Sequence, residues 1–318
     1  MSLSILLYRD FKMSNTFHWD GRDDGTAVNH KRIFQVINQS ESTEYSLIGF
    51  GSDEGVQRNK GRIGAAEAPN AIRKQLANLP VHQTISIADR GDIICQHGLL
   101  EEAQAVLADH VAQALVQGEK PIVLGGGHEV AYGSFSGLFQ YLRTHEPDKN
   151  IGIINFDAHF DLRQADQASS GTPFLQAAQK SKEQGKSFHY LCIGVAKHSN
   201  TKVLFETADR LNAAYILDRD VQVTQLESLK QKIQSFIDQV DYLYVTIDLD
   251  VFASSIAPGV SAPAVKGIDL AVFDPLIQFI KDSGKIRVFD VAECNPKFDL
   301  DNKTAKLAAY IIFNYIFD

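Results

Sequence analysis

The amino-acid sequence predicts a three-layer α/β/α fold built around a parallel β-sheet. From about residue 45 to the C-terminus, apolar runs that read as buried strands alternate with amphipathic, helix-like stretches. The strand-like runs are continuously apolar, which is typical of parallel strands covered by helices on both faces. No Pro/Gly/Ser-rich linker divides the 318 residues, so we expect one large domain.

The elements follow in order along the chain. Residues 1–44 are polar and irregular, and we expect them to pack on the surface of the domain. Helical periodicity is expected in the amphipathic stretches 101–117, 225–240 and 269–283. Buried strands are predicted at 45–51, 120–126, 150–156, 189–195, 213–218, 241–248 and 286–293.

Charge and cysteine content narrow the possible partners and compartment. The formal net charge of -8 argues against nucleic acid or an acidic membrane surface as a partner. No segment approaches the roughly 18 apolar residues of a membrane span. Cys95, Cys192 and Cys294 form neither a metal pair nor a disulfide framework, which favours a reducing cytoplasm.

Acidic and imidazole side chains follow three of the predicted strands. In an extended chain, residues two apart point the same way, so each set can converge on one point at the carboxyl edge of the sheet. One such set alone is explained by a packed histidine or a helix cap, but three sets after buried strands indicate one shared site. The residues are His128 in "GGGHE", Asp157, His159 and Asp161 in "NFDAHFDLR", and Asp248 and Asp250 in "IDLDVF".

Metal ions are the expected occupants of this site. Burying bare carboxylates costs several kcal/mol unless something neutralises them. Four carboxylates and two neutral imidazoles would balance two divalent cations, and the predominance of oxygen ligands favours Mn²⁺ over Zn²⁺. Two such ions would activate a water molecule as a nucleophile at neutral pH.

Taken together, these segments resemble the ureohydrolase superfamily of arginase and agmatinase. Besides the three metal motifs, two further blocks match: "APGVSAP" (257–263) and "DVAECNP" (290–296). Other stretches look closer to the formimidoylglutamase branch of that superfamily: "WDGRDDG" (19–25), "DEGVQRNKGRIGAAEAPNAIR" (53–73), "SSGTPF" (169–174) and "NPKFDLDNKTAKLAA" (295–309).

The resemblance implies a single arginase-like catalytic domain at 45–318, with an eight-stranded parallel sheet and two Mn²⁺ per subunit. It implies a small-molecule substrate, N-formimidoyl-L-glutamate, which is hydrolysed to L-glutamate and formamide in histidine degradation. The superfamily commonly forms trimers or hexamers, so a homo-oligomer is an expectation.

The resemblance also implies roles for individual residues. The predicted metal ligands coincide with those of the family, and Glu293 falls where the family binds a cationic amidine or guanidinium nitrogen. Catalytic roles are implied for Asp161, Glu293 and His159, with Asp161 as the proton carrier to the leaving amine. Phe174 stands at the position to which we assign a proton-transferring histidine of arginase.

The substrate carries two carboxylates, which local cations must hold. Arg163 is the first candidate, because a planar guanidinium matches a carboxylate, with a surface salt bridge as its alternative role. Asn59 and Arg62 are weaker candidates, and a structural role is favoured for Arg62. The loop after the Asp-x-His-x-Asp segment is expected to select the substrate through Ser170, Gly171 and Thr172.

Three other functions compete with this one. Agmatinase, guanidinobutyrase or arginase activity would keep the chemistry, although Arg163 would oppose the cationic tail of agmatine. A related deacetylase with one Zn²⁺ would not need all four carboxylates. A regulatory or storage protein built on a ureohydrolase scaffold would not need the complete ligand set and Glu293.

Overall fold

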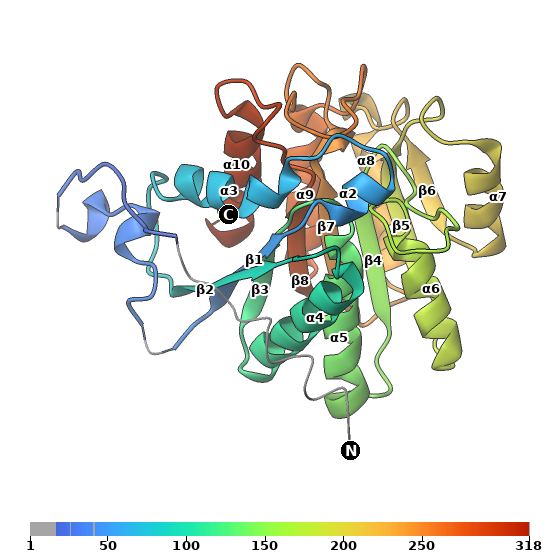
Figure 1. Cartoon of the computed structure of the whole chain (residues 1–318), viewed down its shortest axis with the longest axis horizontal. Coiled ribbons are helices and arrows are strands. Elements are labelled where there is room, and N and C mark those ends of the chain that lie inside the picture. Colours follow the sequence, from blue (N-terminus) through green and yellow to red (C-terminus); the bar gives the residue numbers. More distant parts are fainter. Residues whose placement is uncertain (1–16, 26, 41, 318) are drawn as a thin grey trace.

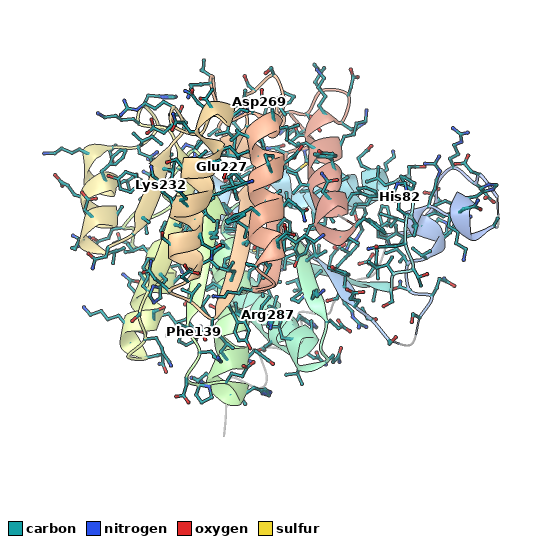
Figure 2. The ribbon with its side chains drawn as sticks, turned by 180° about the vertical axis from the view of Figure 1, so that it is seen from behind. His82, Phe139, Glu227, Lys232, Asp269 and Arg287 are labelled. Carbon is teal, nitrogen blue, oxygen red and sulfur yellow. The ribbon has the colours of Figure 1, made fainter. Side chains whose placement is uncertain are left out.

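The protein folds as an eight-stranded, all-parallel sheet between two layers of helices (Figures 1 and 2). The structure is a computed structural model and describes residues 17–25, 27–40 and 42–317. The strands are β1 (Tyr45–Gly51), β2 (Ile87–Ile94), β3 (Lys120–Leu124), β4 (Ile151–Phe156), β5 (His189–Val195), β6 (Ala214–Leu217), β7 (Tyr242–Asp248) and β8 (Ile286–Ala292).

Helices connect the strands and cover both faces of the sheet. The α-helices are α2 (Glu54–Arg58), α3 (Ala68–Leu76), α4 (Leu100–Val116), α5 (Val130–His145), α6 (Pro173–Glu183), α7 (Lys202–Arg210), α8 (Leu226–Ile237), α9 (Leu270–Asp282) and α10 (Lys303–Phe317). Short 3₁₀ helices lie at Val28–His30, Ile33–Gln35, Ala65–Glu67, Val223–Gln225 and Leu249–Val251. No helix in the described ranges is long and apolar enough to cross a membrane.

Successive side chains of the strands enter two separate hydrophobic cores. Leu47 of β1 packs with α3, α8, α9 and α10 on one face, the face seen in Figure 2. Ile48, the next residue, packs with α4, α5 and α6 on the other. This double burial explains why the strands are continuously apolar. The seven predicted strands are confirmed, with ends that differ by no more than two residues.

Strand β2 is the one strand of the described sheet whose position the sequence did not predict. Its central residues, Asp89 to Asp92, are charged or glycine and read as a loop. In the structure Arg73 of α3 donates hydrogen bonds to Asp89 (2.9 Å) and to Asp92 (2.5 Å), and all three side chains are buried. The charges are neutralised within the fold, and β2 forms one edge of the sheet.

The described part of the N-terminal segment lies against this edge. Ile33 and Ile37 are buried in the core that contains α3, and the Trp19 indole N–H donates a hydrogen bond to Asp89 (2.8 Å). The sequence-based expectation for residues 1–16 lies outside the described residues.

Strand order brings four strand ends together. The sheet runs β2-β1-β3-β8-β7-β4-β5-β6, so β3, β8, β7 and β4 are consecutive at its centre. The chain leaves β3, crosses over through α5 and enters β4, and the strands β8 and β7 lie between these two in the sheet. Open α/β sheets hold their ligands at such positions, outside the carboxyl ends of the strands.

Candidate metal centre and active-site cavity

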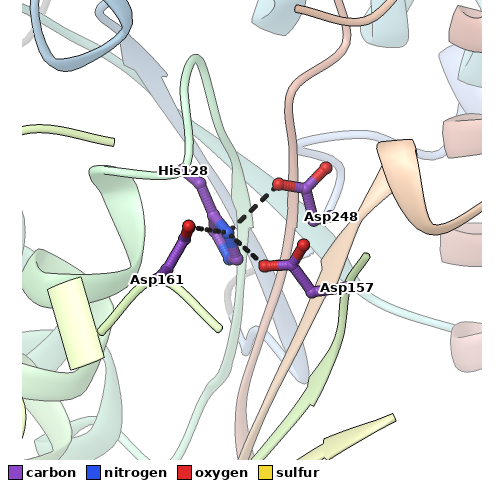
Figure 3. Close-up of side chains that lie close together, drawn as sticks. All are labelled: His128, Asp157, Asp161 and Asp248. Atoms are coloured by element: carbon purple, nitrogen blue, oxygen red, sulfur yellow. Dashed lines mark ion pairs between the residues drawn. The ribbon is translucent and has the colours of Figure 1, made fainter. Parts of the chain in front are cut away.

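A first group of ligand atoms converges on the ring of His128, which follows β3. The Nδ1 atom of His128 lies 2.9 Å from an oxygen of Asp161 and 3.1 Å from oxygens of Asp157 and Asp248 (Figure 3). The three carboxylates come from the loop after β4 and from the end of β7. These four side chains could hold one metal ion.

A second group shares Asp157 with the first. The other oxygen of Asp157 lies 3.4 Å from Nδ1 of His159, and an oxygen of Asp250 lies 3.1 Å from the same nitrogen. Asp157, His159 and Asp250 could therefore hold a second ion. Since each oxygen of Asp157 faces a different histidine, this carboxylate is placed to bridge the two positions.

The donor set fits two divalent cations. An octahedral ion such as Mg²⁺ holds its ligands at about 2.0–2.1 Å, which sets adjacent ligand atoms about 2.9 Å apart. The separations of 2.9–3.1 Å around His128 Nδ1 match this spacing. His128 Nδ1 and Asp250 Oδ1 are also buried, and neither has a hydrogen-bond partner among the described residues. Buried polar atoms normally have such a partner, and a bound metal ion would supply one here.

Protonation of the metal-free cluster reflects this crowding. Burial raises the pKa of Asp161 to about 6, with a further contribution from the charge of Asp157. Burial alone would lower the pKa of His128, but the neighbouring carboxylates of Asp157, Asp161 and Asp248 raise it well above its usual value. The cluster thus holds protons that bound cations would displace.

Turns, and not extended backbone, bring the paired ligands together. The carboxylate of Asp157 accepts a hydrogen bond from the N–H of His159 (2.6 Å), and that of Asp248 accepts one from the N–H of Asp250 (2.8 Å). Asp161 has a left-handed backbone, with φ of +48°. The prediction of an extended chain at these residues is therefore wrong. The side chains of Asp157 and Asp248 each close a turn by accepting a hydrogen bond from the backbone N–H two residues further along.

Neighbouring polar side chains orient the ligands. Nδ1 of His128 can bind a metal when the ring proton is on Nε2, and the hydroxyl of Thr246 lies 3.1 Å from Nε2 to accept it. The amide of Asn155 donates to Asp157 (3.0 Å). Thr246 lies within β7 and Asn155 near the end of β4, and both side chains are buried. Such partners fix the orientation of metal-bound histidines and carboxylates.

Asn200 holds the backbone of the loop that carries His159. Its side-chain oxygen accepts a hydrogen bond from the N–H of Phe160 (3.1 Å), and its amide donates to the carbonyl of Ala158 (2.8 Å). The sequence analysis did not single out Asn200, Thr246 or Asn155. Their positions inside or shortly after a buried strand could have revealed them, because a buried polar side chain needs a hydrogen-bond partner.

Glu293 directly follows β8 and faces the metal ligands. One of its oxygens accepts a hydrogen bond from the N–H of His128 (3.0 Å), whereas the other is buried without a partner in the described structure. Burial, together with the charge of Glu129, raises the pKa of Glu293 to about 8. A cationic ligand at the free oxygen would favour the ionised carboxylate.

The ligands form the buried end of a cavity of about 350 Å³. Among the predicted substrate-binding residues, Asn59, Arg163, Ser170 and Gly171 lie together here, and the Asn59 amide donates to the Ser170 hydroxyl (3.2 Å). The lining comprises Asn59, Lys60, Gly61, Arg62, His128, His159, Asp161, Arg163, Ser170, Gly171, Ser199, Asn200, Leu204, Asp248, Asp250, Ser261, Ala262 and Glu293.

Two of the predicted substrate-binding residues, Arg62 and Thr172, make hydrogen bonds within the protein, a structural role that the sequence analysis favoured for Arg62. Arg62 lines the cavity, but its guanidinium donates to the backbone carbonyls of Ser261 (3.1 Å) and Val260 (2.5 Å). Thr172 is not part of the lining; its hydroxyl interacts with Ser169 and Gln176. These contacts give both side chains a structural task.

Phe174 does not line the cavity either. It is buried in the core, edge-on to the ring of His128 with a centroid distance of 5.4 Å, and stacked on Tyr190 at 4.7 Å. Phe174 therefore offers no proton-transfer group to the cavity, and its correspondence with a histidine of arginase stays an expectation.

Comparison with known proteins agrees with this architecture. Residues 43–317 match the family model described as the arginase family. A formimidoylglutamase of Aeromonas salmonicida is 48% identical over 309 residues, which cover 95% of this chain and 98% of the relative. A formimidoylglutamase of Chromobacterium violaceum is 46% identical over 300 residues, covering 93% and 96%.

Solved structures show the same fold. A formiminoglutamase of Trypanosoma cruzi with Mn²⁺₂ superimposes with a TM-score of 0.79 at 24% identity, over 90% of this chain and 97% of that one. Formimidoylglutamase of Bacillus subtilis gives a TM-score of 0.79 at 19% identity, over 99% and 98%. With the family match spanning the whole sheet and its ligand-bearing loops, the chain belongs to the arginase family.

Proposed function

We propose that this protein is a formimidoylglutamase: a hydrolase that uses two Mn²⁺ ions to cleave N-formimidoyl-L-glutamate into L-glutamate and formamide. The observation that carries the proposal is one cavity with acidic metal ligands at its buried end and free cationic side chains at its exposed end. A substrate with a protonated amidine at one end and carboxylates at the other complements this distribution of charge.

Glu293 would bind the formimidoyl end. Its unpartnered oxygen is directed at the cavity, and a protonated amidine offers N–H donors to it. Arg163 would bind a carboxylate. It is exposed, lines the same cavity, and makes no ion pair with the described residues. The substrate would then span the cavity with its amidine carbon beside the metal ligands.

The chain's own residues would position the reactants and move protons. When bound, the two cations supply a Lewis-acidic site that lowers the pKa of a water molecule and makes it nucleophilic at neutral pH. Asp157 and the paired histidines hold that site in place. Asp161, which lines the cavity beside the proposed metal positions, would accept a proton and pass it to the leaving amine of glutamate.

The other members of the superfamily are the alternative. Agmatinase, guanidinobutyrase and arginase would use the same ligands and the same Glu293. The relatives at 46–48% identity are named formimidoylglutamase, which favours our substrate assignment over these. We further propose a place in histidine degradation and a cytoplasmic enzyme that requires neither nucleic acid nor membrane. A homotrimer or homohexamer stays a prediction.

A substrate panel tests the proposal. The manganese-loaded protein would be incubated with formimidoylglutamate, arginine, agmatine and guanidinobutyrate, and the products identified as formamide, urea or ammonia. We expect formamide and L-glutamate from the first compound and no urea from the others. Urea from a guanidino compound would overturn the substrate assignment while keeping the metal chemistry. Metal analysis should give two manganese ions per chain.

A further inference from the structure

A substrate with two carboxylates needs two cationic contacts, and this inference rests on the function proposed above. Three cationic residues line the cavity: Lys60, Arg62 and Arg163. Arg62 is committed to the backbone carbonyls of Val260 and Ser261, and its guanidinium stacks on a phenylalanine ring at 4.3 Å. Among the described lining residues, Lys60 and Arg163 are the only Lys or Arg side chains for which no hydrogen bond or ion pair within the protein is found.

Lys60 is held at the cavity by an unusual helix end. The N–H of Lys60 bonds to the carbonyl of Gln57 (2.9 Å), and the N–H of Gly61 bonds to that of Val56 (2.8 Å). This pair of bonds closes helices with a left-handed residue, and glycine is the usual choice there because a side chain is strained in that conformation. Here the position is a lysine, with φ of +62°.

Asn59, the residue before Lys60, lies next to the same glycine as the side chain of Arg163. A side chain built on Gly171 would come within 3.2 Å of both Arg163 Nε and Asn59 Nδ2. The loop that bears Lys60 and the side chain of Arg163 therefore meet over the same glycine, at the exposed rim of the cavity. Neither cation makes an ion pair with a described acidic side chain, although four carboxylates line the buried end of the cavity.

We propose that Lys60 binds one carboxylate of the substrate while Arg163 binds the other. With its amidine end beside the metal ligands and Glu293, the substrate would place its two carboxylates toward the exposed end of the cavity, where Lys60 and Arg163 are the cations. The guanidinium of Arg163 suits a two-point contact, and the ammonium of Lys60 suits a single carboxylate oxygen. The retention of a strained lysine where glycine fits best is explained by this contact. Lys60 is a substrate-binding residue and takes no part in bond cleavage.

Lys60→Gly and Lys60→Gln test the proposal with manganese-loaded protein. We expect both to raise KM for formimidoylglutamate about 10-fold or more, as loss of one charged hydrogen bond does, with little change in kcat. Lys60→Gly should also raise the melting temperature, because it relieves the left-handed strain. If Lys60 had only a structural role, the variants with a raised KM would also have a lowered melting temperature.

Two matched controls accompany these variants. Asn212 ends α7 with the same pair of backbone bonds and φ of +53°, and it does not line the cavity. Asn212→Gly should raise stability and leave KM unchanged. Lys232 is exposed on α8, on the face seen in Figure 2. Lys232→Gln changes the net charge as Lys60→Gln does and should also leave KM unchanged.

Truncated substrates identify the contact. N-formimidoyl-4-aminobutyrate lacks the α-carboxylate, and N-formimidoyl-L-2-aminobutyrate lacks the distal one. If Lys60 holds one carboxylate, the KM penalty of Lys60→Gln should vanish with one of these compounds and persist with the other. An equal penalty for all substrates, or none for formimidoylglutamate, would overturn the proposal.

Binding of L-glutamate separates this inference from the proposed function. Calorimetry with the manganese-loaded protein measures that affinity without turnover. Weaker binding of L-glutamate to Lys60→Gln would support the carboxylate contact even in a protein that did not hydrolyse formimidoylglutamate. Hydrolysis by the wild type with unchanged binding and KM in Lys60→Gln would keep the proposed function and reject the role of Lys60.

Discussion

Asp161 combines a ligand oxygen, a left-handed backbone and a raised pKa in one residue. We predict that Asp161→Asn lowers kcat by a factor on the order of 10²–10⁴, the usual contribution of a proton-transfer group. The fold should persist, because asparagine is among the few side chains that tolerate the left-handed region. Steady-state kinetics and a thermal melt would measure the two effects.

Asp166 provides the control for that substitution. It is exposed on the same loop and does not line the cavity that holds the metal ligands. Asp166→Asn should keep both kcat and the melting temperature. Near-wild-type turnover in Asp161→Asn, at full metal content, would remove Asp161 from the proton-transfer role.

Arg163 and Arg62 line the same cavity and should nevertheless respond differently to truncation. Arg163→Ala should raise KM about 10- to 100-fold, the effect of losing a charged hydrogen bond, with kcat little changed. Arg62→Ala should mainly lower the melting temperature, because its guanidinium holds the backbone of residues 260 and 261. KM values and thermal melts of both variants would check this. An unchanged KM in Arg163→Ala would exclude it as a carboxylate ligand.

Residue spacing predicted which side chains meet, but it could not predict the local backbone. Asp157 and Asp248 lie two residues before another ligand, and both are found at the ends of central strands. That they close turns over their own backbone depends on hydrogen bonds that spacing does not specify. Lys60 was missed for the same reason: its place at the cavity comes from a left-handed turn, and the preferred residue for such a turn is glycine.

At the scale of elements, the loop after β5 supports the loop after β4. Asn200 makes this contact through hydrogen bonds to the backbone of Phe160 and Ala158. We predict that Asn200→Ala destabilises the protein by about 1–3 kcal/mol, because the N–H of Phe160 loses its hydrogen-bond partner. The affinity for Mn²⁺ should fall as well, since His159 lies between the two anchored residues. Urea unfolding and metal titration would measure both.

Asn200→Asp is the matched variant for this contact. It keeps the oxygen that accepts from Phe160 and loses the amide that donates to Ala158. A smaller loss of metal affinity than in Asn200→Ala is expected. Unchanged metal binding in Asn200→Ala would show that the two loops are independent.

Element prediction from the sequence succeeded where burial alone shapes the pattern. Strands β4 and β7 have apolar side chains on both faces because helices cover both, and continuous apolar runs reveal them. Strand β2 is equally part of the sheet, but Asp89 and Asp92 are neutralised by Arg73, which comes from another element. A buried ion pair between distant segments leaves no local signature, so β2 reads as a loop.

At the scale of the whole molecule, the parallel sheet concentrates negative charge at the carboxyl ends of its central strands. The carboxyl ends of β3, β8, β7 and β4 are adjacent, and each contributes an acidic or imidazole group to the site. Hydrophobic packing on both faces of the sheet must outweigh the cost of this crowding when the metals are absent. Metal binding should then stabilise the fold, because the ions bind the native state and neutralise the cluster.

This crowding predicts an unusual pH dependence of stability for the metal-free protein. Burial raises the pKa of Asp161 to about 6 and, together with Glu129, that of Glu293 to about 8. The folded state therefore binds more protons than the unfolded state between about pH 4 and 8, and the free energy of unfolding must fall as pH rises through this window. The raised pKa values of His128 and His159 act with the same sign above about pH 6.5, the usual histidine value.

Thermal melts at pH 5.5, 7.0 and 8.5, with and without Mn²⁺, would test this dependence. Without metal, we expect the melting temperature to drop by a few degrees from the lowest to the highest pH, because each kcal/mol shifts it by about 1.5 °C in a chain of 318 residues. With Mn²⁺ the order should reverse, since the ions require the deprotonated ligands and bind more tightly as pH rises. Glu293→Gln should reduce the metal-free decrease between pH 7.0 and 8.5, and the contribution of His128 and His159 should remain. A metal-free protein that becomes more stable toward pH 8.5 would mean that these carboxyl groups ionise freely in the folded state, and that their burial does not govern the charge of the site.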